Sequence, residues 1–206
     1  MTNIFPFTRA TWITLLLAHC TLPLMAQNLV NNGDFSNGSM VSGWAFTTDG
    51  SFDFSSLDAS GDAGSGSGQL TNTATVAFGT SFASQCINGI VAGNSYDFGA
   101  RIRFDSGNTQ TASGRASLVV NFFNGPNCSG SNVGSSTTSN VLSTSTDTWI
   151  QVEILGFAAP TGAVSVQVSL FTNKTEDSGS LTVNFDDVVF GPMGSLPVEL
   201  SQIWIE

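Results

Sequence analysis

The chain has 206 residues and a formal net charge of -10, yet only 10% of its residues are charged. This length allows one domain with a sizeable core. Beyond residue 26 the only cations are Arg101, Arg103, Arg115 and Lys174. Nucleic acids and anionic membrane surfaces are bound by clustered Lys and Arg, so the composition argues against both as partners.

Residues 1–26 have the pattern of a secretory signal peptide. Arg9 precedes an apolar run that begins at Thr11, and Ala26 suits the position before a cleavage site. The run is short for a membrane span, which needs about 20 apolar residues. An uncleaved anchor and lipidation at Cys20 are the alternatives. We therefore predict a secreted or cell-surface protein (or a periplasmic one), with no membrane insertion after cleavage.

The single histidine, His19, lies in this leader. The chain that follows cannot form a Ser-His-Asp or Cys-His nucleophile, or a zinc or copper site with histidine ligands. Its carboxylates remain available to calcium, which prefers oxygen ligands.

Strand patterns dominate the chain. Apolar and polar residues alternate at 95–104, 164–170 and 181–185, which predicts strands with one buried face. Further strands are expected at 69–78, 81–87, 116–123 and 149–157. Polar turns separate these runs, so the sequence predicts an all-β sandwich of two antiparallel sheets.

Two Gly/Ser-rich stretches, 56–68 and 129–148, are predicted loops, and the second is long enough to suggest function or mobility. The expected organisation is a leader at 1–26, one β-sandwich domain at 27–194, and a tail or edge strand at 195–206.

Cys86 and Cys128 remain after the leader. An exported compartment favours a disulfide between them, with two unpaired buried thiols as the alternative. The chain-entropy model gives such a bridge about 4 kcal/mol.

Five short motifs occur in a fixed order between residues 28 and 191. They are Asn32-Gly-Asp-Phe-Ser36, Gly43-Trp44, Gly64-Ser-Gly-Ser-Gly-Gln-Leu70, Thr148-Trp149 and Asp186-Asp187-Val188. Their order resembles that of the jelly-roll carbohydrate-binding modules of families four, nine and twenty-two, within the galactose-binding-like β-sandwiches. The resemblance implies that the first and last strands are neighbours, that both tryptophans pack in the core, and that the domain binds a glycan without catalysis.

The resemblance also implies a structural calcium ion, with Asp34, Asp186 and Asp187 as candidate ligands. In the family a glutamate follows the Asn-Gly-x-Phe motif, and this chain has Ser36 there. Residues 186 and 187 are adjacent on a strand, so their side chains are expected on opposite faces, with one of them in the site. The alternative is a pair of ordinary strand-end carboxylates. An EF-hand at 58–69 is excluded, because Ala63 and Gln69 occupy its glycine and glutamate positions.

For the glycan, the candidate contacts are Phe52 and Phe54 as rim aromatics, and Arg101, Arg103 and Gln167 on polar strand faces. A solvated outer face is the alternative for the last three. Tyr96 is expected in the core. The competing functions are a structural or adhesive surface protein built on the same sandwich, and a glycosidase or lyase, which requires a pair of carboxylates across the scissile bond.

Overall fold

The computed structural model describes residues 27–36, 41–47, 49–107, 113–138, 141–144 and 147–196. The predicted leader and residues 197–206 of the predicted tail, including Trp204, lie outside these ranges. The described chain forms β1 (Ala45–Phe46), β2 (Gly50–Ser55), β3 (Ser67–Asn72), β4 (Thr80–Asn88), β5 (Ser95–Arg103), β6 (Gly114–Phe123), the 3-10 turn η1 (Pro126–Cys128), β7 (Asn132–Thr137), β8 (Val141–Leu142), β9 (Ile150–Ala158), β10 (Ser165–Lys174) and β11 (Leu181–Pro192).

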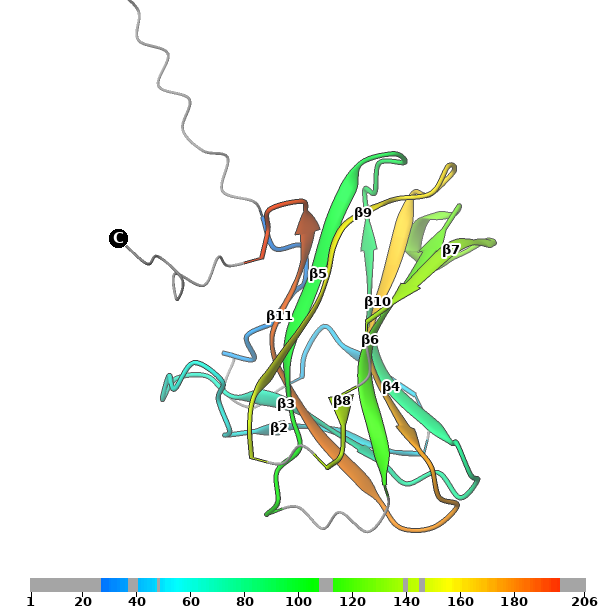
Figure 1. The fold of residues 1–206 in the computed structure, drawn as a ribbon. Helices are drawn as coiled ribbons and strands as arrows, with labels where there is room; N and C mark the ends of the chain where they lie inside the picture. The colour runs from blue at the N-terminus through cyan, green and yellow to red at the C-terminus, as the bar shows by residue number, and fades with distance from the viewer. Residues whose placement is uncertain are drawn as a thin grey trace, which may run out of the picture.

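The strands build two antiparallel sheets that pack face to face (Figure 1). Sheet A has the order β1-β4-β10-β6-β7, with β8 also paired to β6, and sheet B has the order β2-β3-β11-β5-β9. Consecutive strands are seldom neighbours, as is typical of a jelly roll. The predicted all-β sandwich is confirmed, and no helix in the described part of the chain is long and apolar enough to cross a bilayer.

The core forms where the alternating apolar residues of both sheets meet. Phe98, Ile102, Leu118, Val168 and Phe185 are fully buried. Tyr96 is in the core as predicted, and its ring stacks on Phe190 at a centroid distance of 5.4 Å.

One end of the core is an aromatic cluster made of Phe35, Trp44 and Phe52, whose ring centroids lie 6.1–6.2 Å apart. Trp44 thus has its predicted core position. Trp149 does not: it precedes β9, and its side chain is only half-buried.

The segment before β1 lies against β11, at the other end of the domain sequence. The Leu29 N–H donates to the Phe190 carbonyl over 2.7 Å, and the Val188 N–H donates to the Gly33 carbonyl over 2.8 Å. The predicted proximity of the two ends is therefore confirmed, although the first strand, β1, pairs with β4 in sheet A and not with β11 in sheet B. The opening motif is not a strand, however, because Asn32 and Phe35 have positive φ angles of 52° and 48° that break an extended conformation.

The predicted loop at 129–148 contains two strands, β7 and β8, which extend the edge of sheet A along β6. The residues of β7 are Asn-Val-Gly-Ser-Ser-Thr, and this run has no apolar alternation. Its backbone nevertheless pairs with β6, and edge pairing of this kind leaves little trace in a hydrophobicity pattern.

We expect Gly68→Ala to lower the free energy of unfolding by roughly 1–3 kcal/mol, through overpacking. A Cβ at Gly68 would lie 2.4 Å from the Phe52 ring and 2.8 Å from the Phe35 ring, both within the aromatic cluster. Gly64→Ala is the matched control, because a Cβ there would meet only the Asp62 side chain, at 3.4 Å. Urea denaturation of both variants would measure the difference, and equal stabilities would contradict the prediction.

Candidate ligand-binding groove

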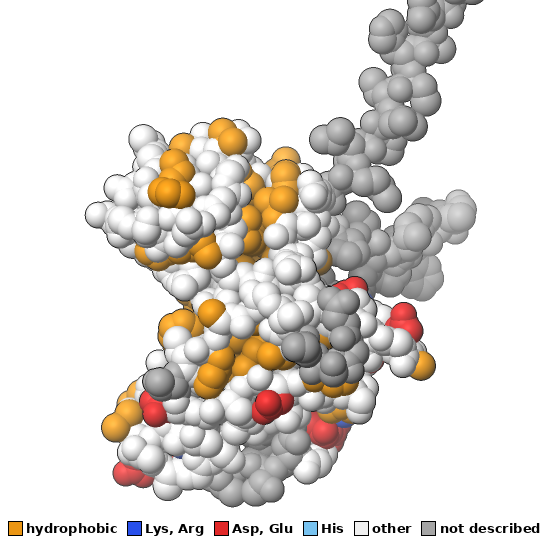
Figure 2. Space-filling model, turned by 180° about the vertical axis from the view of Figure 1, so that it is seen from behind, with side chains coloured by type: hydrophobic (Ala, Val, Ile, Leu, Met, Phe, Trp, Pro, Cys, Tyr) orange, Lys and Arg blue, Asp and Glu red, His pale blue; other side chains and the backbone are white. Residues whose placement is uncertain are grey.

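The outer face of sheet A carries a shallow hollow of about 100 Å³. Six side chains from its three central strands line this groove: Phe82 of β4, Val119 and Asn121 of β6, and Gln167, Ser169 and Phe171 of β10. In the space-filling view, the outline of the molecule narrows at mid-height on the side of sheet A, where hydrophobic side chains (orange) lie among uncharged atoms (white) (Figure 2).

Strand register brings these side chains together. Phe171 of β10 lies directly opposite Phe82 of β4. Four residues earlier on β10, Gln167 lies opposite Asn121 of β6. Because side chains alternate between faces, this register puts the rings at one end of the groove and the amides at the other. The two rings are nearly parallel, with an interplanar angle of 20° and a centroid distance of 6.5 Å.

The amides keep unused hydrogen-bonding capacity. Gln167 Nε2 donates to the Ser84 hydroxyl over 3.4 Å, and Asn132 Nδ2 donates to Asn121 Oδ1 over 3.4 Å. Within the described chain, the side-chain carbonyl oxygen of Gln167 and the side-chain amide nitrogen of Asn121 take part in neither of these two bonds. An acceptor and a donor therefore remain for a ligand beside an apolar surface.

A disulfide borders the amide end of the groove. Cys86 and Cys128 are bonded, as predicted, with their Cα atoms 5.8 Å apart. Cys86 lies opposite Gln167 on the outer face of sheet A. The loop that carries Cys128 is also held by the Asn127 N–H, which donates to the side chain of Asn88 over 2.7 Å. The groove therefore has one covalently fixed boundary.

The strands of sheet A contain no Asp or Glu, and their charged residues are Arg115 and Lys174. Lys174 is fully buried, and its ammonium group donates to the Ala74 and Gly179 carbonyls, over 2.6 Å each. The lining of the groove is therefore uncharged.

Of the predicted ligand contacts, Gln167 lies in this groove. Phe52 does not: it is 7% exposed, and it packs in the aromatic cluster. Phe54 is half-buried against the core. Both residues belong to the inward-facing positions of β2 rather than to the loop after it, so the predicted rim positions are wrong.

Arg101 and Arg103 lie on β5 in sheet B, away from the groove. Arg101 donates to the Ala59 carbonyl over 3.0 Å and pairs with Asp187 at 3.4 Å. Arg103 pairs with Asp147 at 3.4 Å and with Asp105 at 3.8 Å. Both arginines therefore fasten loops to the outside of sheet B.

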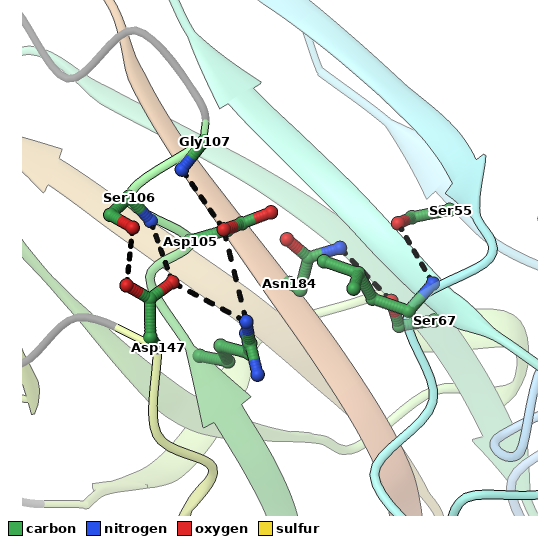
Figure 3. A network of polar contacts seen from close by, with 9 residues as sticks. Ser55, Ser67, Asp105, Ser106, Gly107, Asp147 and Asn184 are labelled. Atoms are coloured by element: carbon green, nitrogen blue, oxygen red, sulfur yellow. Dashed lines mark hydrogen bonds and ion pairs between the residues drawn. The ribbon is translucent and has the colours of Figure 1, made fainter.

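Figure 3 shows how Asp105 and Asp147 lie in this network, with Ser106 next to the Asp147 carboxylate. Ser106 donates to Asp147 through both its N–H, over 3.0 Å, and its hydroxyl. These bonds hold the pKa of the Asp147 carboxyl below its usual value. On the neighbouring strands, Asn184 donates to the Ser67 hydroxyl over 2.9 Å.

Asp186 and Asp187 do not face opposite sides as predicted. A bulge interrupts β11 between Asp186 and Val189, and Asp187 has a φ of 48°. The bulge carries both carboxylates to the loop at 56–66, where Asp186 accepts from the Ala59 N–H over 2.8 Å and Asp187 accepts from the Ser60 hydroxyl over 3.2 Å.

Asp186 is 1% exposed, and burial raises the pKa of its carboxyl to about 7. Its two oxygens accept hydrogen bonds from the N–H groups of Ala59 and Asp187. The carboxylate of Asp187 is paired with the Arg101 guanidinium. These two predicted calcium ligands thus already have protein partners.

Asp34 is exposed, and its carboxylate accepts hydrogen bonds from the N–H and hydroxyl of Ser36, over 3.2 and 3.1 Å. In the described ranges, no three acidic, histidine or cysteine side chains gather. Calcium also takes backbone carbonyls and water as ligands, so calcium binding at Asp34, Asp186 or Asp187 stays a prediction.

Phe82 and Phe171 were not predicted from the sequence as ligand contacts, although the position of Phe171 on its strand could have indicated it. On β10 the outward positions are Ser165, Gln167 and Ser169, and Phe171 continues this polar series with a ring. An aromatic residue in the polar phase of an alternating strand is a candidate for a binding surface.

No protein-family model matches the sequence, and no curated protein matches it. Solved structures do share the fold. The enzymatically active domain of tailspike protein 4 from bacteriophage CBA120 has a TM-score of 0.62 at 15% identity, over 81% of this chain and 21% of that one. An arabinose-bound α-L-arabinofuranosidase of the GH51 type has a TM-score of 0.58 at 16% identity, over 82% and 26%.

A structure described under carbohydrate-binding modules of the β-sandwich superfamily, with promiscuous specificity, has a TM-score of 0.52 at 18% identity, over 79% of this chain and 61% of that one. The chain thus spans 21–61% of the length of these three structures. At these identities the likeness concerns the fold. The shared fold is a jelly-roll β-sandwich, as the sequence motifs implied.

Proposed function

We propose that this protein is an exported, non-catalytic module that binds a poly- or oligosaccharide in the groove of sheet A. The observation that carries the proposal is one uncharged hollow that combines two aromatic rings with two amides, each of which keeps one unused hydrogen-bonding atom. Sugars present apolar C–H faces as well as hydroxyl groups, so a site for them combines an aromatic surface with convergent polar groups.

Catalysis is not part of the proposal. Glycosidases use two carboxylates roughly 5–10 Å apart, across the scissile bond. The six residues that line the groove include no carboxylate, and neither do the strands of sheet A. Binding without turnover is the function that this chemistry supports.

The test is isothermal titration against a panel of soluble glycans, together with pull-downs on insoluble ones. We expect Phe171→Ala and Phe82→Ala each to weaken binding about tenfold or more, which corresponds to about 1.4 kcal/mol. Leu155→Ala is the control, because Leu155 is 61% exposed on sheet B and its loss should leave the affinity unchanged.

Absence of binding across the panel, or equal affinities of the wild type and both phenylalanine variants, would contradict the proposal. Self-association without glycan affinity would favour the structural or adhesive alternative. Turnover of a polysaccharide by the purified chain would favour the enzyme.

Export is the second part of the proposal. It is supported by the leader pattern of residues 1–26 and by the disulfide, which persists in oxidising compartments. Expression of the full chain in a bacterial host, followed by fractionation and mass spectrometry, should find a chain shortened near Ala26 outside the cytoplasm. A full-length chain in the cytoplasmic fraction would contradict export.

A further inference from the structure

Three of the four cations beyond residue 26 have structural partners. Arg101 and Arg103 are in ion pairs on sheet B, and Lys174 is buried against carbonyl groups. The fourth is Arg115 on β6, which is half-buried and whose side chain makes no hydrogen bond or ion pair within the described chain. Its guanidinium donors therefore remain available to a ligand.

Arg115 is on the outer face of sheet A, the same face as the groove. Along β6 the outward positions are Arg115, Ser117, Val119 and Asn121, and the last two line the groove. Ser117 lies opposite Phe171, and Arg115 lies opposite Asn173, two residues further along β10. Two residues of strand span about 7 Å, which an arginine side chain can reach across. Arg115 therefore stands at the aromatic end of the groove.

The strands of sheet A carry no carboxylate that would oppose an anion at this position. The carboxylates of the strands belong to sheet B, whose outer face is separated from the groove by the sandwich core, about 10 Å thick. Because Coulomb energy falls with distance, these carboxylates oppose a ligand in the groove less than the adjacent guanidinium attracts it. Glu176, in the loop after β10, accepts from the Ser113 N–H over 3.4 Å and forms no ion pair with Arg115.

We propose that Arg115 is an anion-recognition subsite at the aromatic end of the groove, and that the preferred ligand is a glycan bearing acidic groups. The proposal rests on the proposed function, since it names the class of glycan bound in the same groove. A guanidinium presents planar, paired N–H donors that match a carboxylate or a sulfate ester, so either group satisfies the chemistry. The rings and amides would hold the sugar, and Arg115 would select for its charge.

The experiment uses the chain without its leader and pairs each acidic probe with a neutral derivative. Alginate, polygalacturonan and glucuronoxylan are compared with their carboxyl-reduced forms, and carrageenan is compared with its desulfated form. We expect the wild type to bind at least one acidic probe about tenfold more tightly than its neutral derivative, and to lose this preference at high salt. The carboxylate and sulfate arms identify which acidic group is recognised.

Arg115→Gln should abolish the preference while keeping the affinity for the neutral derivative, and Arg115→Lys should keep part of it. Arg101→Gln is the matched control, since it removes an arginine from sheet B and should leave the preference intact. Equal binding of acidic and neutral forms by the wild type, or a preference that survives Arg115→Gln, would overturn the inference but not the proposed function. Binding of no glycan in either form would overturn both.

Discussion

Replacing both cysteines, Cys86→Ser with Cys128→Ser, is expected to lower the free energy of unfolding by about 4 kcal/mol. The bridge joins residues 42 positions apart, so its removal gives the unfolded chain a much larger set of conformations. Urea denaturation of the double variant and of the wild type, both without reductant, measures the difference. Removing both thiols together avoids a free cysteine that could form dimers.

The folded sandwich should persist in this variant. The loop that carries Cys128 keeps its other attachments, because the Cys128 N–H donates to Ser165 over 3.1 Å and Asn127 remains bonded to Asn88. Near-ultraviolet circular dichroism should therefore retain the native aromatic signal at low urea. Asn88→Ala is the control for loop contacts alone, because it removes both the acceptor of the Asn127 N–H and the amide that donates to the Asn127 side chain, and it should cost less than the double variant. A change below 1 kcal/mol in the double variant would mean that the bridge contributes little beyond these hydrogen bonds.

The sandwich could be predicted because burial leaves a direct pattern in the sequence. On β5 the buried Tyr96, Phe98 and Ile102 alternate with more polar positions, and this period defines both the strand and its inner face. The disulfide could be predicted for a different reason, since the two cysteines after the predicted leader leave one possible pair. Both inferences use only local pattern or counting.

The groove could not be predicted in the same way. Gln167 was selected because it is polar on a strand, and the same criterion selected Arg101 and Arg103, which lie on the other sheet. Local alternation separates inner from outer faces but does not say which strands share a sheet. That information comes from long-range pairing, such as the register that sets Phe171 beside Phe82.

The bulge in β11 caused a further error. Strict alternation would place Asp186 and Asp187 on opposite faces, whereas one residue with a positive φ shifts the phase and leaves both beside the loop at 56–66. Asp is among the residues that tolerate this conformation, so the pair of aspartates was compatible with a bulge but did not require one.

The stability of the fold should fall as the pH rises from about 4 to about 7, and Asp186 is the expected cause. In the folded chain burial raises the pKa of its carboxyl from 3.8 to about 7, whereas the unfolded chain releases this proton near pH 4. Between these values the folded state binds more protons than the unfolded state, so each rise in pH favours unfolding. Below about pH 4 and above about pH 7 this group adds no slope.

One full pKa unit corresponds to about 1.4 kcal/mol. The shift from 3.8 to about 7 already includes the N–H groups of Ala59 and Asp187, which partly stabilise the charged form, so we expect roughly 4 kcal/mol over the whole window. Urea denaturation at intervals between pH 4 and pH 8, with a chelator present throughout, would measure it.

Two variants separate Asp186 from the other titrating groups. Asp186→Asn has no proton to release, so the stability difference between wild type and variant should change with pH in this window and level off above pH 7. Ser60→Ala removes a neighbouring contact to Asp187 without removing a charge, so it should shift the stability by the same amount at every pH. If Asp186→Asn keeps the wild-type slope, another group carries the pH dependence. If the slope is opposite in sign, the hydrogen bonds to Asp186 outweigh its burial, and the carboxylate is the stable form in the fold.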